Sequence, residues 1–251
     1  MSSPSSVPVR DAVILAAGNG DRFKNSHHHS KLLHPVLGQP LIVRTLETAA
    51  AAGIPTLNVV LGYEAERVRE TIERHRITKA TVRFTYNPDW HLENGVSALQ
   101  ARTLCEDRRF ALLMGDHLFE SSVLRRMATL EVAAGDSILA IDSSSDVDPV
   151  IAEEATKVQL AGDRIVAIGK ALRHWDALDT GLFVFTPALF AALEDAARSG
   201  ETTLSAGVQR LAARRLMKGV DIGAAAWCDV DTVTDVEVAE SLFGAVEPEH
   251  A

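Results

Sequence analysis

Cysteines and long apolar runs are scarce in this sequence. Its 251 residues include two cysteines, Cys105 and Cys228, which are too few for a disulfide framework or a cysteine metal cluster. No apolar run approaches the roughly 18 residues that a membrane-spanning helix needs. The opening residues lack the basic start and apolar stretch of a signal peptide, so residues 1–10 are predicted to be a disordered tail. We therefore expect a cytoplasmic protein without a membrane partner.

Basic residues are outnumbered by acidic ones. Lys and Arg total 25 against 34 Asp and Glu, and the formal net charge is −9. A field of this sign repels nucleic acid, so no nucleic-acid partner is expected, and an anionic substrate would need a local cationic pocket. The hydrophobic share of 47% and the charged share of 24% are ordinary for a globular protein. With the chain length, they predict a single domain over residues 11–245.

Short apolar runs alternate with longer amphipathic stretches over the first 145 residues. The runs are typical of strands buried in a parallel sheet, and the stretches between them are typical of crossover helices. The expected strands are 11–17, 56–61, 81–86, 110–114 and 137–141, and the expected helices are 40–52, 64–76, 95–106 and 120–134. This series predicts an α/β fold with a doubly wound sheet.

The pattern changes after residue 145. Two short runs flank an Ala-Gly-Asp segment, which indicates a hairpin turn. The expected elements are a hairpin of 156–160 with 164–168, strand 179–186, helices 187–198 and 205–218, strand 220–228 and a terminal helix after residue 231. We therefore expect a mixed, mostly parallel sheet with an inserted β-hairpin region.

Two closely spaced glycines, Gly18 and Gly20, follow the first expected strand. Glycines at such a turn let backbone amides approach a phosphate without intervening side chains. A dinucleotide-binding fingerprint would need a third glycine, but Phe23 stands in its place. Arg22 and Lys31 follow instead, and two cations beside a glycine-rich loop suit a polyphosphate whose charge grows during displacement. A plain tight turn is the alternative interpretation of the glycines.

The motif around this loop extends to residue 42. It is Leu-Ala-Ala-Gly-x-Gly-x-Arg over residues 15–22, followed by Lys31 and by Leu-x-x-x-x-Gly-x-Pro-Leu-Ile over residues 33–42. This motif resembles the signature of the sugar-phosphate nucleotidyltransferases. The sequence departs from the signature at Ser30, which stands where proline usually precedes the lysine, and residues 25–29 lengthen the loop.

The resemblance implies a GT-A-like fold and roles for the residues of the motif. Arg22 and Lys31 would be catalytic. The nucleotide would contact the end of the first strand and the glycine loop, at Leu15, Ala16, Ala17, Gly18 and Gly20.

Further segments extend the resemblance from residue 11 to about residue 240. They are 87–97, 114–117, 154–158, 168–170, 179–183 and 227–231. They are similar to the CTP:inositol-1-phosphate cytidylyltransferases, and more loosely to the phosphocholine cytidylyltransferases. The former make up half of bifunctional enzymes whose membrane-embedded half this sequence lacks, so we expect a free-standing enzyme. The resemblance implies CTP and a phosphorylated cyclitol or sugar as substrates, and it leaves open whether a homodimer forms.

Two carboxylates stand at the ends of expected strands. Asp116 follows strand 110–114 and Asp231 follows the last strand, and ligands of open α/β sheets bind at the carboxyl ends of strands. Such a pair can hold one Mg²⁺, which prefers oxygen ligands. The resemblance implies the same pair, with Asp116 also binding the nucleotide. Asp229 shares a face with Asp231 in an extended segment, so the sequence leaves open which of them binds, and helix capping is the alternative role of Asp116 and Asp231.

Asn94, Gly95 and Ser97 lie at an expected strand-to-helix turn. An amide side chain and helix-start N–H groups can read the edge of a pyrimidine there, and a glycine allows the base to approach closely. We therefore expect these residues to bind the nucleotide, with helix capping as the alternative role of Asn94.

Three further charged residues lie in or near the hairpin region. Lys157 and Lys170 are expected to bind the phosphate of the second substrate, and Asp179 is expected to accept hydrogen bonds from its hydroxyl groups. Solubilising surface charges and a buried, capped acid are the alternatives. The histidines at 27–29 are consecutive and would not converge on one ion, so they are predicted to form a solvated loop.

Together these features predict a cytidylyltransferase. In the expected reaction, a phosphate oxygen of inositol 1-phosphate, or of a similar cyclitol or sugar phosphate, attacks the α-phosphorus of CTP and releases pyrophosphate. The nearest alternatives are another acceptor, such as phosphocholine, a phosphonate or a sugar 1-phosphate, and another nucleotide, UTP or GTP. A GT-A glycosyltransferase that uses residues 229–231 and a non-catalytic sugar-phosphate sensor are more distant alternatives.

Overall fold

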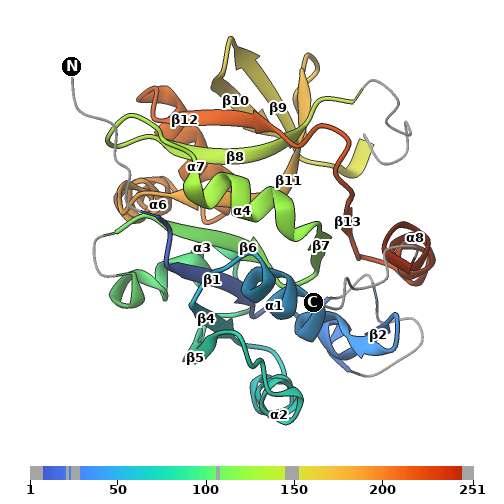
Figure 1. The fold of residues 1–251 in the computed structure, drawn as a ribbon. Coiled ribbons are helices and arrows are strands. Elements are labelled where there is room, and N and C mark those ends of the chain that lie inside the picture. The colour runs from blue at the N-terminus through green and yellow to red at the C-terminus, as the bar shows by residue number, and fades with distance from the viewer. Residues whose placement is uncertain (1–7, 21–22, 24–28, 106–107, 145–152, 245–251) are drawn as a thin grey trace.

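A mixed β-sheet flanked by helices forms the centre of the molecule (Figure 1). The computed structural model describes residues 8–20, 23, 29–105, 108–144 and 153–244. Within them, nine strands form one sheet in the order β5-β4-β1-β6-β11-β8-β12-β10-β9. Their bounds are β1 Asp11–Ala16, β4 Thr56–Leu61, β5 Thr81–Tyr86, β6 Phe110–Met114, β8 Ser137–Asp142, β9 Lys157–Ala161, β10 Arg164–Gly169, β11 Ala177–Phe185 and β12 Met217–Asp221.

Helices and short strands complete the described part of the chain. The helices are α1 Leu41–Ala51, α2 Ala65–His75, α3 Asn94–Leu99, α4 Ser121–Thr129, α6 Ala188–Arg198, α7 Leu204–Ala213 and α8 Val233–Gly244, with 3₁₀ helices η2 Lys31–Leu33 and η3 Arg102–Leu104. The short strands are β2 Pro35–Val36, β3 Gln39–Pro40, β7 His117–Phe119 and β13 Trp227–Asp229. None of the helices described has the length and apolarity needed to span a membrane.

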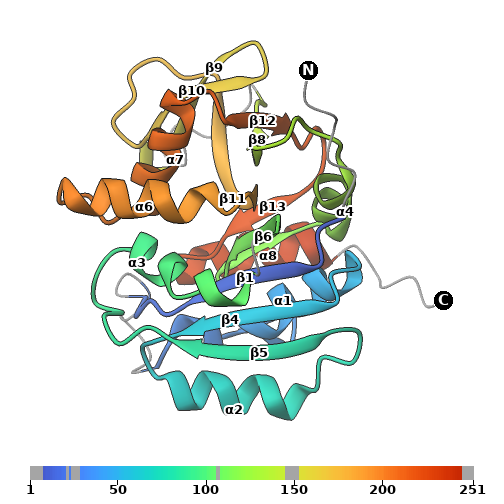
Figure 2. The same cartoon turned by 90° about the vertical axis from the view of Figure 1, so that its left-hand side faces the viewer.

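Parallel pairing is concentrated in one part of the sheet. β5, β4, β1 and β6 are parallel neighbours (Figure 2), whereas β11 is antiparallel to both β6 and β8. β9 and β10 form the expected hairpin, so the predicted α/β fold with a mixed sheet and a hairpin is confirmed. Because parallel strands end at the same edge of a sheet, the segments that follow β1, β4 and β6 meet there.

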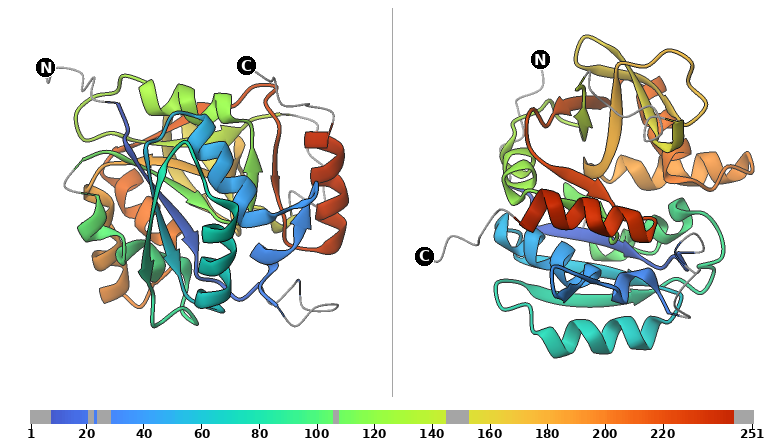
Figure 3. Two further views of the ribbon diagram at one scale, coloured as in Figure 1. Left: turned by 60° about the horizontal axis from the view of Figure 1, so that its bottom comes forward. Right: turned by 90° about the vertical axis from the view of Figure 1, so that its right-hand side faces the viewer.

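The alternation of side chains along β1 explains the two helical layers. Ile14 belongs to an apolar cluster that includes Leu46 of α1 and Leu124 of α4. Leu15 belongs to a second cluster that includes Phe190 of α6. Successive residues of a strand point to opposite faces, so the fully buried β1 requires apolar layers on both sides. A third, smaller cluster holds α8 beside β2 and β13 (Figure 3).

Two predictions for the last third of the chain are wrong in extent. The predicted helix 205–218 is shorter, because Arg215 adopts a left-handed φ of 59° and the chain then enters the sheet as β12. The predicted strand 220–228 is split into β12 and β13, since Gly223 turns the chain with a φ of 67°. The local sequence favours a helix up to residue 218, but the pairing of β12 with β8 overrides this propensity.

Candidate active site

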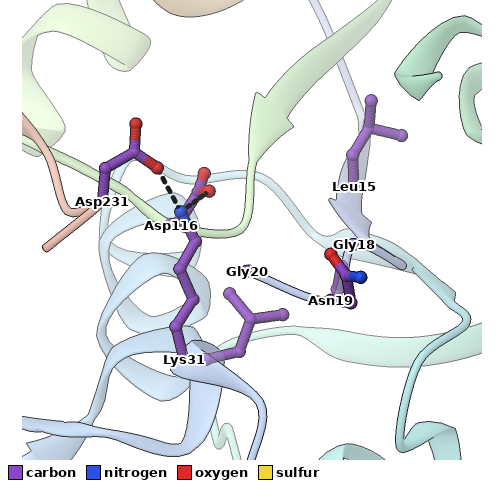
Figure 4. Close-up of a pocket in the computed structure, with 9 residues that line it drawn as sticks. Leu15, Gly18, Asn19, Gly20, Lys31, Asp116 and Asp231 are labelled. Atoms are coloured by element: carbon purple, nitrogen blue, oxygen red, sulfur yellow. Dashed lines mark hydrogen bonds and ion pairs between the residues drawn. The ribbon is translucent and has the colours of Figure 1, made fainter. Parts of the chain in front are cut away.

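A cavity of about 280 Å³ opens at the edge of the sheet where β1 and β6 end (Figure 4). Asp116 lies in the turn after β6, and Asp231 lies in the segment after β13. Both carboxylates lie close to Lys31, although Asp231 is 200 positions away in the sequence. The cavity is lined by Leu15, Ala16, Gly18, Asn19, Gly20, Lys31, Leu32, Asp116 and Asp231. All of these except Asn19 and Leu32 belong to the predicted site, so residues selected from distant parts of the sequence share one pocket.

The glycine loop accommodates the side chain of the lysine. Gly20 has a φ of 60°, and a Cβ atom at this position would lie 2.9 Å from the Cγ of Lys31. A Cβ atom at Gly18 would meet no atom of the described residues within 4 Å, so the backbone there borders open space in the described part of the chain. Ala17 is buried and does not line the cavity, and its carbonyl accepts a hydrogen bond from the Tyr63 N–H at 2.9 Å.

The ammonium group of Lys31 lies between the two predicted metal ligands. Its Nζ is 2.7 Å from Asp116 Oδ2 and 2.6 Å from Asp231 Oδ1 (Figure 4). Burial opposes the charge on Lys31, but the two carboxylates hold its pKa above the usual range. Burial likewise opposes ionisation of Asp116, whereas Lys31 and His117 hold the pKa of that carboxyl well below its usual range. Lys31 and Asp116 therefore both carry their charges at neutral pH.

A second cluster lies on the other side of Asp116. Short strands β7 and β13 pair in antiparallel fashion with His117 opposite Asp229. His117 Nδ1 is 3.0 Å from Asp116 Oδ1 and 3.6 Å from Asp229 Oδ1. Burial raises the pKa of Asp229 to about 6, since the attraction of His117 is offset by the nearby negative charges. Burial opposes protonation of His117, but Asp229 and Asp116 raise its pKa to about 9.

The side chains of Asp116, His117 and Asp229 are arranged as a divalent cation site would require. Potential ligand atoms of Asp116, His117 and Asp229 all lie within 4.8 Å of one another. Asp229 Oδ1 is buried and has no hydrogen-bond partner among the residues that the structure describes. Carboxylate oxygens are the ligands that Mg²⁺ prefers. Asp229, which the sequence left as an open choice, is therefore as well placed as Asp231, whose carboxylate contacts Lys31.

The start of α8 leaves the Asp231 side chain directed toward the cavity. Asp235 Oδ2 accepts hydrogen bonds from the backbone N–H groups of Asp231 and Thr232, at 3.0 and 2.6 Å. Thr232 Oγ1 accepts the Asp235 N–H at 3.4 Å, so Thr232 and Asp235 together cap α8, which is the role considered for Asp231. The Asp231 carboxylate meets Lys31 instead.

The three residues predicted to read the base have partners within the protein. Asn94 Oδ1 accepts the Leu204 N–H at 2.8 Å, and Ser97 Oγ accepts from the side-chain amide of Asn87 at 2.9 Å. A Cβ atom at Gly95 would lie 2.5 Å from the carbonyl oxygen of Thr202. These contacts join α3 to the segment before α7 and to the end of β5. Their role in nucleotide binding stays a prediction.

The predicted acceptor residues are divided between two places. Lys157 is 8% exposed, and its Nζ donates to the carbonyls of Glu153 and Lys170 at 3.3 and 3.0 Å. The side chain of Lys170 is exposed. Asp179 lies closer to the acidic cluster: its Oδ1 accepts the Gly181 N–H at 2.8 Å, and burial raises its pKa to about 6 against the effects of that N–H and of His117.

Gly181 makes room for His117. Its φ is 74°, and a Cβ atom would lie 2.5 Å from His117 Cδ2. Trp227 stacks on the imidazole from the neighbouring strand, with ring centroids 6.5 Å apart, and its indole N–H donates to Asp142 at 2.8 Å. His117 was not among the site residues predicted from the sequence, although a histidine directly after Asp116 at a strand end was a signal that could have identified it.

Arg22 and the histidines at 27 and 28 lie outside the described residues. His29 is described, and its ring lies beside Glu64 with Nδ1 3.3 Å from Oε1. The catalytic role of Arg22 therefore stays a prediction.

The similarity of this chain to known proteins extends over nearly its whole length. Residues 12–216 match the family model described as the MobA-like NTP transferase domain. The chain is 34% identical to the "Bifunctional IPC transferase and DIPP synthase" of Rubrobacter xylanophilus over 92% of its own length and 51% of that protein. It is 32% identical to the protein of the same name from Aquifex aeolicus, over 94% of this chain and 52% of that one. The chain thus spans about half the length of these curated relatives.

A solved structure shows the same fold. The inositol-1-phosphate CTP transferase from T. maritima superposes with a TM-score of 0.83 and 24% identity, covering 97% of this chain and all of that one. The expected GT-A-like nucleotidyltransferase fold is confirmed. From the match to its family model, the chain belongs to the MobA-like NTP transferase domains.

Proposed function

We propose that this protein transfers the cytidylyl group of CTP to inositol 1-phosphate, giving CDP-inositol and pyrophosphate. A phosphate oxygen of the acceptor attacks the α-phosphorus in line. The bond from that phosphorus to the bridging oxygen breaks, and its electrons leave with pyrophosphate. The observation that carries the proposal is the convergence of the glycine loop, Lys31, Asp116 and Asp231 on one cavity.

The residues of the cavity supply binding and charge stabilisation. The backbone at Gly18 borders open space and receives the phosphates through its amides. Lys31 neutralises the negative charge that develops on the leaving pyrophosphate, which is the main demand of phosphoryl and nucleotidyl transfer. Arg22 acts with it in our proposal. No side chain needs to form a covalent intermediate.

Asp116, with Asp229 or Asp231, would hold a Mg²⁺ ion. When bound, such an ion neutralises phosphate charge and orients the triphosphate. Support comes from the grouping of Asp116, His117 and Asp229 and from the buried Asp229 Oδ1, which accepts no hydrogen bond from the described residues. His117 then keeps Asp116 oriented through its 3.0 Å contact.

The choice of CTP and inositol 1-phosphate is supported by the relatives. The T. maritima protein of similar fold is an inositol-1-phosphate CTP transferase. Asp179 is the side chain that we assign to the cyclitol hydroxyls, and Lys157 and Lys170 are assigned to the acceptor phosphate. Asn94, Gly95 and Ser97 are assigned to the base. The cytoplasmic location, the homodimer and the lack of nucleic-acid and membrane partners stay predictions.

Pyrophosphate release tests the proposal. The purified protein, with Mg²⁺, is given each of ATP, CTP, GTP and UTP with and without inositol 1-phosphate. We expect release with CTP only, dependent on the acceptor. Release with CTP only after phosphocholine, a phosphonate or a sugar 1-phosphate replaces inositol 1-phosphate would keep the chemistry and reject the cyclitol. No release with any pair would reject nucleotidyl transfer and favour the sugar-phosphate sensor or the glycosyltransferase.

A further inference from the structure

The residue before Lys31 is held by a carboxylate from another element. The Ser30 N–H donates to Glu64 Oε2 at 2.5 Å, and the Ser30 carbonyl accepts the Leu33 N–H at 3.0 Å. Ser30 is 2% exposed. Both backbone hydrogen-bonding groups of Ser30 are therefore fixed where the chain enters η2, whose first residue is Lys31.

Glu64 is in turn held by its neighbours. Arg67 Nη1 donates to Glu64 Oε1 at 2.8 Å, and the Glu64 side chain is 16% exposed. Burial opposes its ionisation, but the Ser30 N–H and the Arg67 guanidinium hold the pKa of Glu64 below its usual range. The group is thus a carboxylate at neutral pH, and the Ser30 N–H has a charged acceptor, which makes a stronger hydrogen bond than a neutral one.

The backbone at Glu64 is unusual for a residue with a long side chain. It adopts φ 48° and ψ 34°, a left-handed conformation that glycine or asparagine would adopt at lower cost. Such a conformation persists where the surroundings determine it. The preceding residue, Tyr63, donates its N–H to the Ala17 carbonyl at 2.9 Å. The turn between β4 and α2 is therefore tied to the glycine loop by Tyr63 and to the lysine segment by Glu64.

Ser30 also stands where the related motif has proline. Its φ of −52° lies within the range to which a proline ring restricts the backbone. Proline would hold that conformation by its ring, but it has no N–H to donate. In this chain the hydrogen bond from the Ser30 N–H to Glu64 restrains the backbone at this position instead.

We propose that Glu64 is a positioning residue that fixes Lys31 for catalysis through the backbone of Ser30. The inference rests on the proposed function, because it assigns Lys31 a role in cytidylyl transfer. Glu64 does not touch the substrates in this account. It acts by limiting the positions of the peptide that carries the lysine.

Three variants of helix α2 and its cap test the contact. E64A removes the acceptor and keeps a Cβ atom, so the backbone cost at this position is unchanged. E64Q keeps an oxygen that can accept the Ser30 N–H. E66A is the matched control, because Glu66 is an exposed acid of the same helix turn whose carboxylate contacts Tyr86. We expect kcat to fall about tenfold in E64A and less than about threefold in E64Q, with E66A unchanged.

A double-variant cycle separates positioning from general destabilisation. S30P removes the donor and keeps a compatible φ. If Glu64 acts through this N–H, the proline ring replaces the restraint, so S30P keeps kcat within about threefold of wild type, and adding E64A to S30P lowers kcat by no more than about threefold further. The proposal would be overturned if E64A lowered kcat about tenfold in the S30P background as well, if E64Q lost as much as E64A, or if E64A had the same kcat as E66A.

Hydrogen exchange of the Ser30 amide gives a readout that does not need activity. We expect its exchange to be about tenfold faster in E64A than in wild type and E66A. If wild type releases no pyrophosphate, the proposed function fails, and the exchange still tests whether Glu64 holds Ser30. If exchange is unchanged in E64A, the positioning role is rejected even in an active enzyme.

Discussion

Lys31 is the residue whose loss should reduce turnover most. It is buried between Asp116 and Asp231 at 2.7 and 2.6 Å. We expect K31A to lower kcat by about 10²–10³-fold, the usual effect of removing a group that stabilises transition-state charge. It should also lower the melting temperature without Mg²⁺, because two nearby carboxylates lose their shared cation.

Melting curves with and without Mg²⁺ and pyrophosphate release rates check this prediction. Mg²⁺ should raise the melting temperature of K31A more than that of wild type, since the two carboxylates become available to it. Equal turnover in K31A would remove Lys31 from the mechanism. An equal Mg²⁺ shift in both proteins would mean that the ion binds elsewhere, for instance at Asp229.

Gly181 allows a comparison between two glycines with similar backbones. Gly181 and Gly162 have φ of 74° and 63°, but a Cβ atom would lie 2.5 Å from His117 at the first and meet nothing within 4 Å at the second. G162A should cost about 1–2 kcal/mol of stability from its backbone alone. G181A should cost about 1–3 kcal/mol more from overpacking, and should lower turnover because His117 contacts Asp116. Urea unfolding measures both, and equal losses would contradict the contact.

Asp179 should make stability depend on pH. Burial raises its pKa to about 6, above the value of about 3.9 in an unfolded chain. Its contribution to stability is therefore present below about pH 4 and is lost as pH rises through about 6. D179N keeps an oxygen for the Gly181 N–H and removes the titration. Relative to wild type, its unfolding free energy should rise by about 2 kcal/mol from pH 4 to pH 7, and a constant difference in urea titrations would contradict this.

At the scale of elements, the junction between α3 and α7 shows that a sequence motif alone does not predict which partner its residues contact. Asn94 and Gly95 were selected because an amide and a glycine at a helix start suit a base. The structure shows Asn94 in contact with the first residue of α7, through Leu204 N, and Gly95 in contact with the chain just before it, through the Thr202 carbonyl. A glycine motif in a sequence predicts a close approach, but whether to a ligand or to another backbone depends on which helices pack together.

N94A distinguishes the two roles of this junction. Loss of the hydrogen bond to Leu204 N–H should lower stability by about 1 kcal/mol, as for other helix-start contacts. If Asn94 also reads the base, KM for CTP should rise and discrimination against UTP should fall. Thermal melts and steady-state kinetics over both nucleotides separate these effects. A stability loss with unchanged KM would leave Asn94 with a structural role alone.

The short strand β13 explains why the residues of the proposed metal site could be only partly predicted. Asp116 was predictable because it follows a buried strand at the binding edge of the sheet. The sequence left Asp229 and Asp231 as equal candidates. The structure pairs Asp229 with His117 in a separate two-stranded sheet, and no local pattern predicts that pairing. Periodicity reports which residues share a face of one strand, but it does not report the register between segments more than 100 residues apart.

At the scale of the whole molecule, the alternation of elements was predictable and the pairing order was not. Continuous apolar runs indicated β1, β4 and β6 because strands covered on both faces need them. The antiparallel β11 between β6 and β8 follows from no local signal, since its apolar residues fit either direction. That strand is nevertheless what joins the part of the sheet that bears the glycine loop to the part that bears the hairpin.

This continuous sheet predicts that the chain unfolds as one unit. Trp90 lies near β5, at one edge of the sheet, and its ring centroid is 5.3 Å from that of Tyr63. Trp175 precedes β11, which pairs with β9 at the opposite edge of the sheet. Variants that keep only one of these tryptophans should show the same urea midpoint, because separation at β11 would expose the buried Phe183 and Phe185. Two distinct midpoints would instead divide residues 11–245 into two folding units, with the boundary at β11.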